Sequence, residues 1–331
     1  MKQNNSKALR EATGIQSDAF LPILLSTVCM SVAFLLTVID RFIYNFGGEI
    51  ISPIIAQVII LLIPSYLCFM LTEPQKKLFE QLKGIGVGKL SANYIFFMIF
   101  SAFLLISTSF LLNVIFGGIY PISKGFTLMG TFTAGVGDYT VAYPYLIVVY
   151  ALIPAVIEEL LFRGLLYKLF SKLGEDVAIL LSVLISALFS FSVVGLPASL
   201  LCGAAYCFIR KTTGSLQASM IVHFIFNLYG IFMQTNVAQY YLSSHNDLLL
   251  IMIVLIIWLI SSALFCTEAA RIYQIKAKRV VSGEESSNLT AIKPSVVAKK
   301  LKEIFSCRTN AICSVILLVL FVATSAIGYF A

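Results

Sequence analysis

The chain has 331 residues, of which 59% are hydrophobic and only 12% are charged, and its mean hydropathy is +0.95. Soluble domains carry about 25% charged residues, so this composition excludes an ordinary soluble protein. The formal net charge of +7 comes from basic residues gathered between apolar blocks. No aromatic–basic module accompanies that charge, so we expect no nucleic-acid partner.

The apolar residues form blocks of about 20, the length that a helix needs to cross a bilayer. We therefore expect an all-α, polytopic membrane protein with nine transmembrane helices. The predicted spans cover residues 20–39, 51–71, 94–117, 144–167, 177–194, 196–210, 215–235, 248–266 and 311–330. The sixth span is short for a full crossing, so we expect it to be tilted, buried or re-entrant.

The basic residues predict the orientation of the chain. With the N-terminus inside, twenty of the 23 Lys and Arg residues lie in inner segments, and nine of these lie in segment 267–308. This bias predicts a cytoplasmic N-terminus in the cell membrane. We expect segment 267–308 to be a loop on anionic lipid headgroups. Segment 74–92 suits either a short amphipathic helix or a plain connector, and segment 118–142 is expected to be an outer loop.

Ionisable residues interrupt the fourth span. Glu158, Glu159 and Arg163 lie in an otherwise apolar helix, where each charged side chain costs about 2.5–3.5 kcal/mol on insertion scales. Glu159 and Arg163 are offset by about 40° around a helix axis and can pair, whereas Glu158 lies about 140° from Arg163. The pairing gives Glu159 a structural role and leaves the Glu158 carboxylate to act on substrate. The alternative is a buried network of all three residues that only holds helices together.

The seventh span carries a second polar pair, His223 and Asn227, which lie four residues apart and so share a helix face. Under the predicted topology, Glu158 lies about 15 Å and His223 about 12 Å from the inner surface. One cavity can therefore contain both, although a histidine that only packs between helices is the alternative. Glu158 would then activate water, and His223 with Asn227 would stabilise a tetrahedral oxyanion.

Zinc hydrolysis is not favoured, because the sequence has no HExxH and only one histidine within a span. We therefore expect no cofactor and no metal. A carboxylate at membrane depth would also suit a proton-coupled transporter, but the internal repeats typical of transporters are absent from the sequence.

The pattern of Glu158-Glu159, Arg163, His223 and Asn227, with Phe162-Arg163-Gly164, resembles the CPBP family over about residues 140–235. That family includes CAAX prenyl endopeptidases, bacteriocin-processing and self-immunity proteins, and lysostaphin-resistance-like proteins. The resemblance implies a helical intramembrane protease with a cavity open to the inner side. It also implies that Glu158 is the base and that the substrate is a membrane-associated peptide or protein. It divides the chain into N-terminal helices (1–139), a catalytic core (140–235) and C-terminal helices (236–331).

One motif of that family is altered here. The family pattern FxxxH supplies a histidine that binds the water, but Phe189 is followed by Val193 at the histidine position, and a shift of one residue offers Ser192. A serine hydroxyl can hold a water but is no base near pH 7. Two hypotheses follow: an active endopeptidase whose site is completed differently, or a non-catalytic relative that binds peptides or confers bacteriocin self-immunity.

Overall fold

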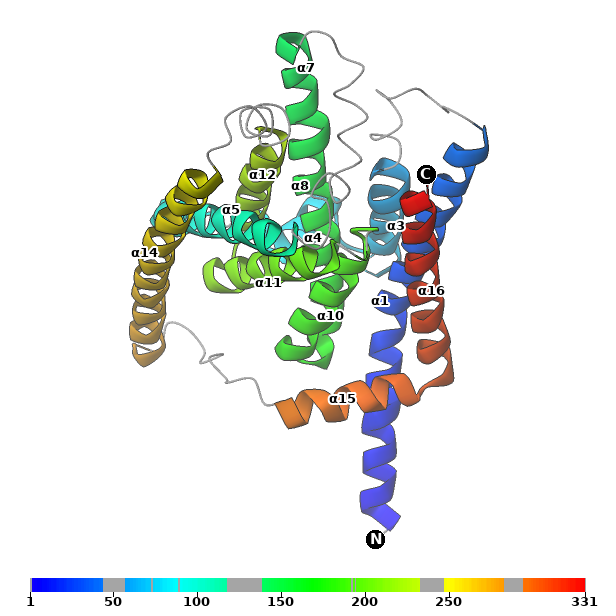
Figure 1. The fold of residues 1–331 in the computed structure, drawn as a ribbon. Coiled ribbons are helices and arrows are strands. Elements are labelled where there is room, and N and C mark those ends of the chain that lie inside the picture. Colours follow the sequence, from blue (N-terminus) through cyan, green and yellow to red (C-terminus); the bar gives the residue numbers. More distant parts are fainter. Residues whose placement is uncertain are drawn as a thin grey trace. The chain divides into compact units, whose positions relative to one another are not determined.

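Helices are the only regular structure in the residues that the computed structural model describes (Figure 1). These are residues 2–43, 57–72, 74–88, 90–117, 139–191, 193, 195–232, 247–282 and 294–330. The predicted all-α class is thereby confirmed. The chain forms two compact units, each built from discontinuous segments. Unit 1 comprises Met1–Ile85, Leu160–Ala204 and Leu289–Ala331, and unit 2 comprises Gly86–Glu159 and Ala205–Asn288.

Unit 1 is organised around two long helices, α1 (Lys2–Ile43) and α16 (Arg308–Phe330), which pack along each other. Polar contacts fasten them near the N-terminal end of α16. Asn310, which is fully buried, donates through Nδ2 to the carbonyl oxygen of Gln16 at 3.0 Å, and Thr27 Oγ1 donates to the carbonyl of Cys313. The side-chain bonds matter because lipid offers no water to satisfy these groups.

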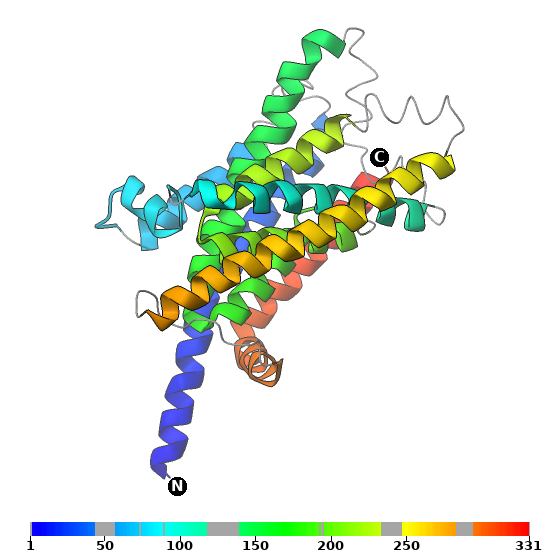
Figure 2. The same ribbon diagram turned by 90° about the vertical axis from the view of Figure 1, so that its left-hand side faces the viewer.

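A short basic helix, α15 (Pro294–Ser306), lies across α1 and α16 rather than along them, and it is seen nearly end-on in the second view (Figure 2). Its buried Ile304 faces the interior of the unit, and Lys300 donates to the carbonyl oxygen of Leu173. Cys307 separates α15 from α16. Backbone N–H groups of Asn310 and Thr309 hydrogen-bond to its sulfur and lower the pKa of the thiol.

The remaining helices of unit 1 are short. They are η1 (Val58–Leu62), α3 (Ile63–Thr72), α4 (Leu78–Gly84), η5 (Leu160–Leu166), α9 (Tyr167–Phe170), η6 (Ser171–Leu173) and α10 (Glu175–Leu188). The sequence of segment 74–92 is compatible with a short helix or a plain connector. Helix α4, of seven residues, confirms the short helix in the middle of the segment.

Unit 2 contains three long helices among its described residues: α5 (Ile95–Gly117), preceded by η2 (Ala92–Tyr94); α12 (Leu216–Phe232); and α14 (Asp247–Val281). It also contains three short helical segments that follow one another directly, α7 (Tyr139–Leu146), η4 (Ile147–Leu152) and α8 (Ile153–Glu159). Helix α11 (Leu196–Thr213) enters this unit at Ala205. Helix α12 packs on α5, η4 and α8, so it occupies the centre of unit 2.

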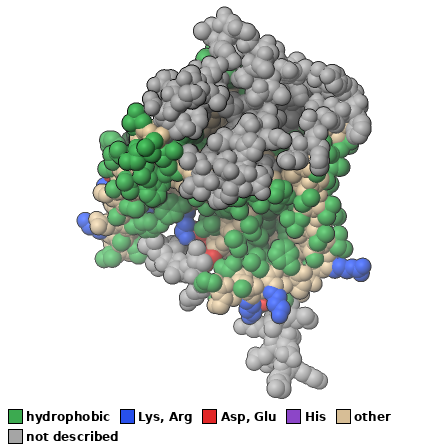
Figure 3. Space-filling model, viewed as in Figure 1, with side chains coloured by type: hydrophobic (Ala, Val, Ile, Leu, Met, Phe, Trp, Pro, Cys, Tyr) green, Lys and Arg blue, Asp and Glu red, His purple; other side chains and the backbone are tan. Residues whose placement is uncertain are grey.

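Within the described ranges, five helical stretches are long and apolar enough to cross a membrane: Ala12–Ile39, Ala92–Leu112, Tyr143–Leu173, Leu248–Val281 and Arg308–Ile327. Hydrophobic side chains cover most of the described surface on the face drawn in Figure 3. The chain is thus an integral membrane protein. The second and seventh predicted spans correspond to shorter apolar helices, Val58–Thr72 and Leu216–Ile231. The count of nine crossings, the cytoplasmic N-terminus and the three-part division at 139 and 235 stay predictions.

Segment 267–308 differs from the expected loop. Helix α14 runs on past the apolar block to Val281, and α15 occupies residues 294–306. Charged residues such as Lys276 and Arg279 continue the helix because Lys and Arg are good helix formers. Segment 118–142 lies almost wholly outside the described residues, which resume at Tyr139.

Candidate active site

Glu158 and Glu159 are the last two residues of α8, and wide π-helical turns lie on both sides of that helix. The π-helical segments are η4 before it and η5 after it. π-Helical turns are rare in proteins, but those that occur are often found at functional sites. They change the angular spacing of side chains, so an ideal α-helical wheel does not describe the neighbourhood of the two glutamates.

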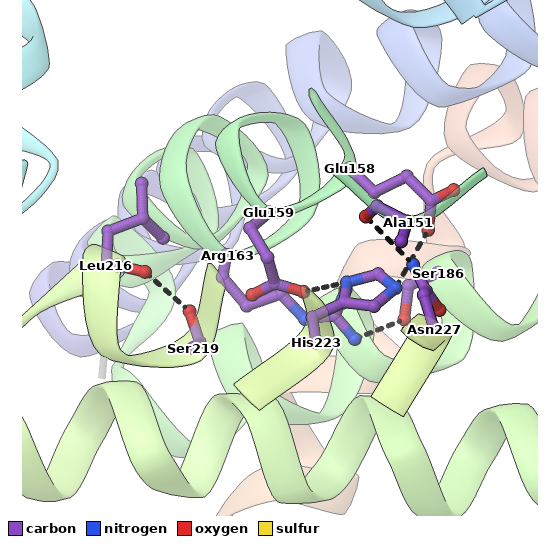
Figure 4. A network of polar contacts seen from close by, with 9 residues as sticks. All are labelled: Ala151, Glu158, Glu159, Arg163, Ser186, Leu216, Ser219, His223 and Asn227. Carbon is purple, nitrogen blue, oxygen red and sulfur yellow. Dashed lines mark hydrogen bonds and ion pairs between the residues drawn. The ribbon is translucent and has the colours of Figure 1, made fainter. Parts of the chain in front are cut away.

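His223, on α12, lies between the two carboxylates (Figure 4). Its Nδ1 is 3.2 Å from Glu159 Oε1, and its Nε2 is 3.9 Å from Glu158 Oε2. The first distance is that of a hydrogen bond and the second is longer than one. Each ring nitrogen therefore faces a different glutamate, and the predicted proximity of Glu158 and His223 is observed.

Burial distinguishes the two glutamates. The side chain of Glu159 is 0% exposed, whereas that of Glu158 is 31% exposed. A buried charge requires a close partner, and the imidazole at 3.2 Å is one partner of Glu159. Glu158 is the carboxylate that water or a substrate can reach.

Asn227 lies one turn beyond His223 on α12. Its Nδ2 donates to the carbonyl oxygen of Ala151 at 3.4 Å (Figure 4). Ala151 belongs to η4, so the helix that carries the glutamates also anchors the carboxamide. An amide nitrogen has two hydrogens, and one of them suffices for this bond.

Arg163 belongs to η5 in unit 1, where it is almost completely buried. It donates through Nη2 to Ser186 Oγ on α10 at 3.2 Å. Gly203 lies beside both groups: a Cβ there would come within 3.2 Å of the Arg163 nitrogen and 3.0 Å of Ser186 Oγ. Glu159 belongs to the other unit, so its pairing with Arg163 stays a prediction.

The altered motif lies in a turn after α10 rather than inside a helix. Phe189 follows the last residue of α10 and contacts the rings of Phe162 and Phe191. Phe191 has a positive φ of 51°, which a non-glycine residue rarely adopts. Val193 is 56% exposed, and Ser192 lies outside the described residues.

Two neighbours of His223 were not predicted from the sequence. One is Glu159, for which the residue spacing predicts only Arg163 as a partner. The other is Tyr206 on α11, whose ring stacks on the imidazole with 4.6 Å between ring centroids and 17° between planes. The sequence does not predict the contact between Tyr206 and His223, because Tyr206 is one of several aromatic residues in apolar segments.

The donor atoms do not converge on a metal position. Glu159 faces Nδ1 and Glu158 faces Nε2 of one imidazole, so the two carboxylates lie at different edges of the ring. Within the part of the chain that the structure describes, no three His, Cys, Asp or Glu side chains are grouped as metal ligands. A zinc site needs three or four ligands around one ion, and these residues do not fit it.

Comparison with known proteins gives one family. Residues 140–229 match the family described as Rce1-like, type II CAAX prenyl endopeptidase. No curated protein and no solved structure matches the chain. The matched segment contains Glu158, Glu159, His223 and Asn227, and it agrees with the resemblance seen in the sequence. The match over residues 140–229 of this integral membrane protein therefore supports its relation to the CAAX-type proteases of the CPBP family.

Proposed function

We propose that the protein is a membrane-embedded endopeptidase of the cell membrane that cleaves membrane-associated peptides with water activated by Glu158. One observation carries the proposal: a single imidazole lies between an accessible carboxylate, Glu158, and a buried one, Glu159. An accessible base with a positioned imidazole beside it suits general-base hydrolysis. The family match over residues 140–229 supports a peptide as the substrate.

The distances suit a bound water. Glu158 Oε2 and His223 Nε2 are 3.9 Å apart, which is too long for a direct hydrogen bond. A water oxygen placed to one side can lie about 2.8 Å from both atoms at once. In the proposed reaction Glu158 takes a proton from this water while the water oxygen bonds to the peptide carbonyl carbon. Glu158 then passes that proton to the leaving amine as the carbon–nitrogen bond breaks.

Asn227 and His223 would stabilise the oxyanion formed in the first step. The Nδ1 edge of the imidazole contacts Glu159, so a hydrogen on Nε2 would be directed away from Glu159 and could donate to the developing charge. The second hydrogen of Asn227 Nδ2 would donate to the same oxygen, with the first held by Ala151. Donors fixed in advance are most effective where charge develops during the reaction. Before the reaction, the same Nε2 edge contacts the water, which is the role of the histidine that Val193 replaces.

The test uses purified protein in lipid nanodiscs and a library of membrane-anchored peptides, with products identified by mass spectrometry. We expect wild-type protein to release defined fragments and Glu158→Gln to release none above background. Glu80→Gln, an exposed carboxylate on α4, is the matched control and is expected to cleave normally. Equal cleavage by wild type and Glu158→Gln would contradict the proposal.

A second candidate function is a non-catalytic relative that binds peptides, as a self-immunity protein would. The exposed valine in the altered motif favours it. In the same nanodiscs, such a protein would retain a labelled peptide intact, with equal affinity in wild type and Glu158→Gln. Fragment release by wild type alone excludes this alternative.

Anionic lipids are the proposed surface partner of α15. This helix lies across the spanning helices of its unit, and the side chain of Lys299 is 79% exposed. A basic residue near an anionic surface contributes about 1 kcal/mol, or about fivefold in affinity. Lys299→Gln with Lys302→Gln should therefore reduce the phosphatidylglycerol retained after detergent extraction. Lys299→Arg with Lys302→Arg should retain it, and equal loss in both double variants would refute the charge argument.

A further inference from the structure

We infer that Tyr206 is a positioning residue for His223: its ring holds the imidazole plane so that Nε2 faces Glu158. The inference rests on the proposed function, because it assigns Tyr206 to the same site. Tyr206 is 2% exposed and His223 is 7% exposed, so the two stacked rings are enclosed by protein. All of the residues concerned belong to unit 2.

Glu159 alone does not fix the imidazole. The terminal torsion of a histidine side chain is broad and nearly two-fold, so the ring turns easily about the bond that carries it. The hydrogen bond from Nδ1 to Glu159 selects which edge of the ring faces that carboxylate. It leaves the tilt of the ring plane about the Nδ1···Oε1 line open.

The stack supplies the missing restraint. With planes 17° apart and centroids at 4.6 Å, tilting the imidazole would drive its edge into the tyrosine ring. A symmetrical ring face does not distinguish the two flipped orientations of the histidine, but Glu159 does. The two contacts are therefore complementary: Glu159 selects the edge and Tyr206 selects the plane, and together they direct Nε2 toward Glu158.

Tyr206 is itself held firmly. Its neighbours Cys207 and Ile209 on α11 are almost fully buried, and Phe208 packs against Phe97 and Phe265. At the end of the helix Lys276 Nζ donates to the carbonyl oxygen of Lys211. Because these contacts restrain α11, the Tyr206 ring has a fixed position against the imidazole.

The first measurement is kinetic. Misplacing a reacting group by about 1 Å costs up to about 100-fold in rate, so Tyr206→Met should lower kcat by about 10- to 100-fold. KM should stay the same, because Tyr206 is not expected to touch the peptide. Tyr206→Phe retains the ring and should restore kcat. Tyr206→Leu serves as a second variant if the Met variant does not fold, with folding checked by thermal unfolding.

The second measurement does not depend on activity. The chain has two histidines, His223 and His245, so a His245→Gln background leaves one imidazole for NMR in the full-length protein. A face-stacked tyrosine ring shifts the imidazole carbon-bound protons upfield. Tyr206→Met should abolish that shift and Tyr206→Phe should preserve it.

The outcomes separate this inference from the proposed function. An unchanged imidazole shift in Tyr206→Met, or an unchanged kcat in a variant that has lost the shift, overturns the inference and leaves the protease proposal standing. If wild type shows the shift but cleaves no peptide, the proposed function fails, and the catalytic meaning of the stack fails with it. Loss of both kcat and the shift, restored together in Tyr206→Phe, supports the inference.

Discussion

The polar cluster between α8 and α12 and the turn that follows α10 differ in almost every physical respect. In the cluster, His223 is enclosed, its two nitrogens face carboxylates and its ring face is covered by Tyr206. In the turn, the position expected for histidine is an exposed valine in irregular backbone. The family pattern is thus intact in the enclosed cluster around His223 and altered in the exposed turn after α10. The difference supports the proposal that catalysis takes place in the cluster and not in the turn, and the following experiments test it.

Removing the imidazole should have the largest effect. In His223→Leu the buried Glu159 loses its imidazole partner, and a lost hydrogen bond to a charged group costs about 1.5–3 kcal/mol in the free energy of unfolding. Loss of the Nε2 group should also lower kcat by about 10²–10⁴-fold. Thermal unfolding and peptide cleavage measure the two effects. A stable, active His223→Leu protein would show that the cluster is not the site.

Asn227→Ala should lower kcat by about 10²–10³-fold, the usual loss for one oxyanion-stabilising donor. KM should change little, because the donor acts on charge that develops only in the reaction. Asn93→Ala, on the exposed η2 turn, is the matched control. A rise in KM with constant kcat would indicate a substrate-binding role in place of oxyanion stabilisation.

Glu159→Gln should have an intermediate effect. Glutamine retains an acceptor for Nδ1–H, but a hydrogen bond to a neutral group is weaker than one to a charge by about 1.4 kcal/mol, which is about tenfold. We expect kcat to fall by that factor, well short of the effect of Glu158→Gln. Equal losses in the two variants would mean that the buried and accessible carboxylates do not have separate roles.

Val193→His should change kcat by no more than about twofold, as is usual for surface substitutions. The reason is that Val193 is 56% exposed and lies beyond the last residue of α10. Val193→Ala controls for loss of the valine. A clear rise in turnover in the histidine variant alone would show that the altered motif still reaches the reacting water.

A metal chelator should have no effect at all. The carboxylates lie at different edges of the His223 ring, so they do not converge on one ion. Cleavage rates measured with and without 1,10-phenanthroline check this expectation. Inhibition reversed by added zinc would contradict it and would require metal ligands other than this cluster.

The sequence predicted the all-α class because apolar blocks are read directly from residue type, but it did not predict that α14 continues to Val281 or that α15 is helical. It also predicted that Glu158 and His223 lie near each other, since both depths follow from the helical rise. It did not predict the π-helical turns, the Ala151 carbonyl that holds Asn227, or the stacked Tyr206. The last two depend on contacts between segments distant in the sequence, which helical spacing does not encode.

The only tryptophan in the chain, Trp258 on α14, donates its indole N–H to Thr108 Oγ1 on α5 at 3.0 Å. Fluorescence excited at the red edge of indole absorption therefore arises from a single, defined place. Its emission colour and lifetime report whether these two helices stay joined when a peptide enters or a detergent replaces lipid. Trp258 is thus an intrinsic fluorescent probe of the α5–α14 contact in unit 2, and no label has to be attached.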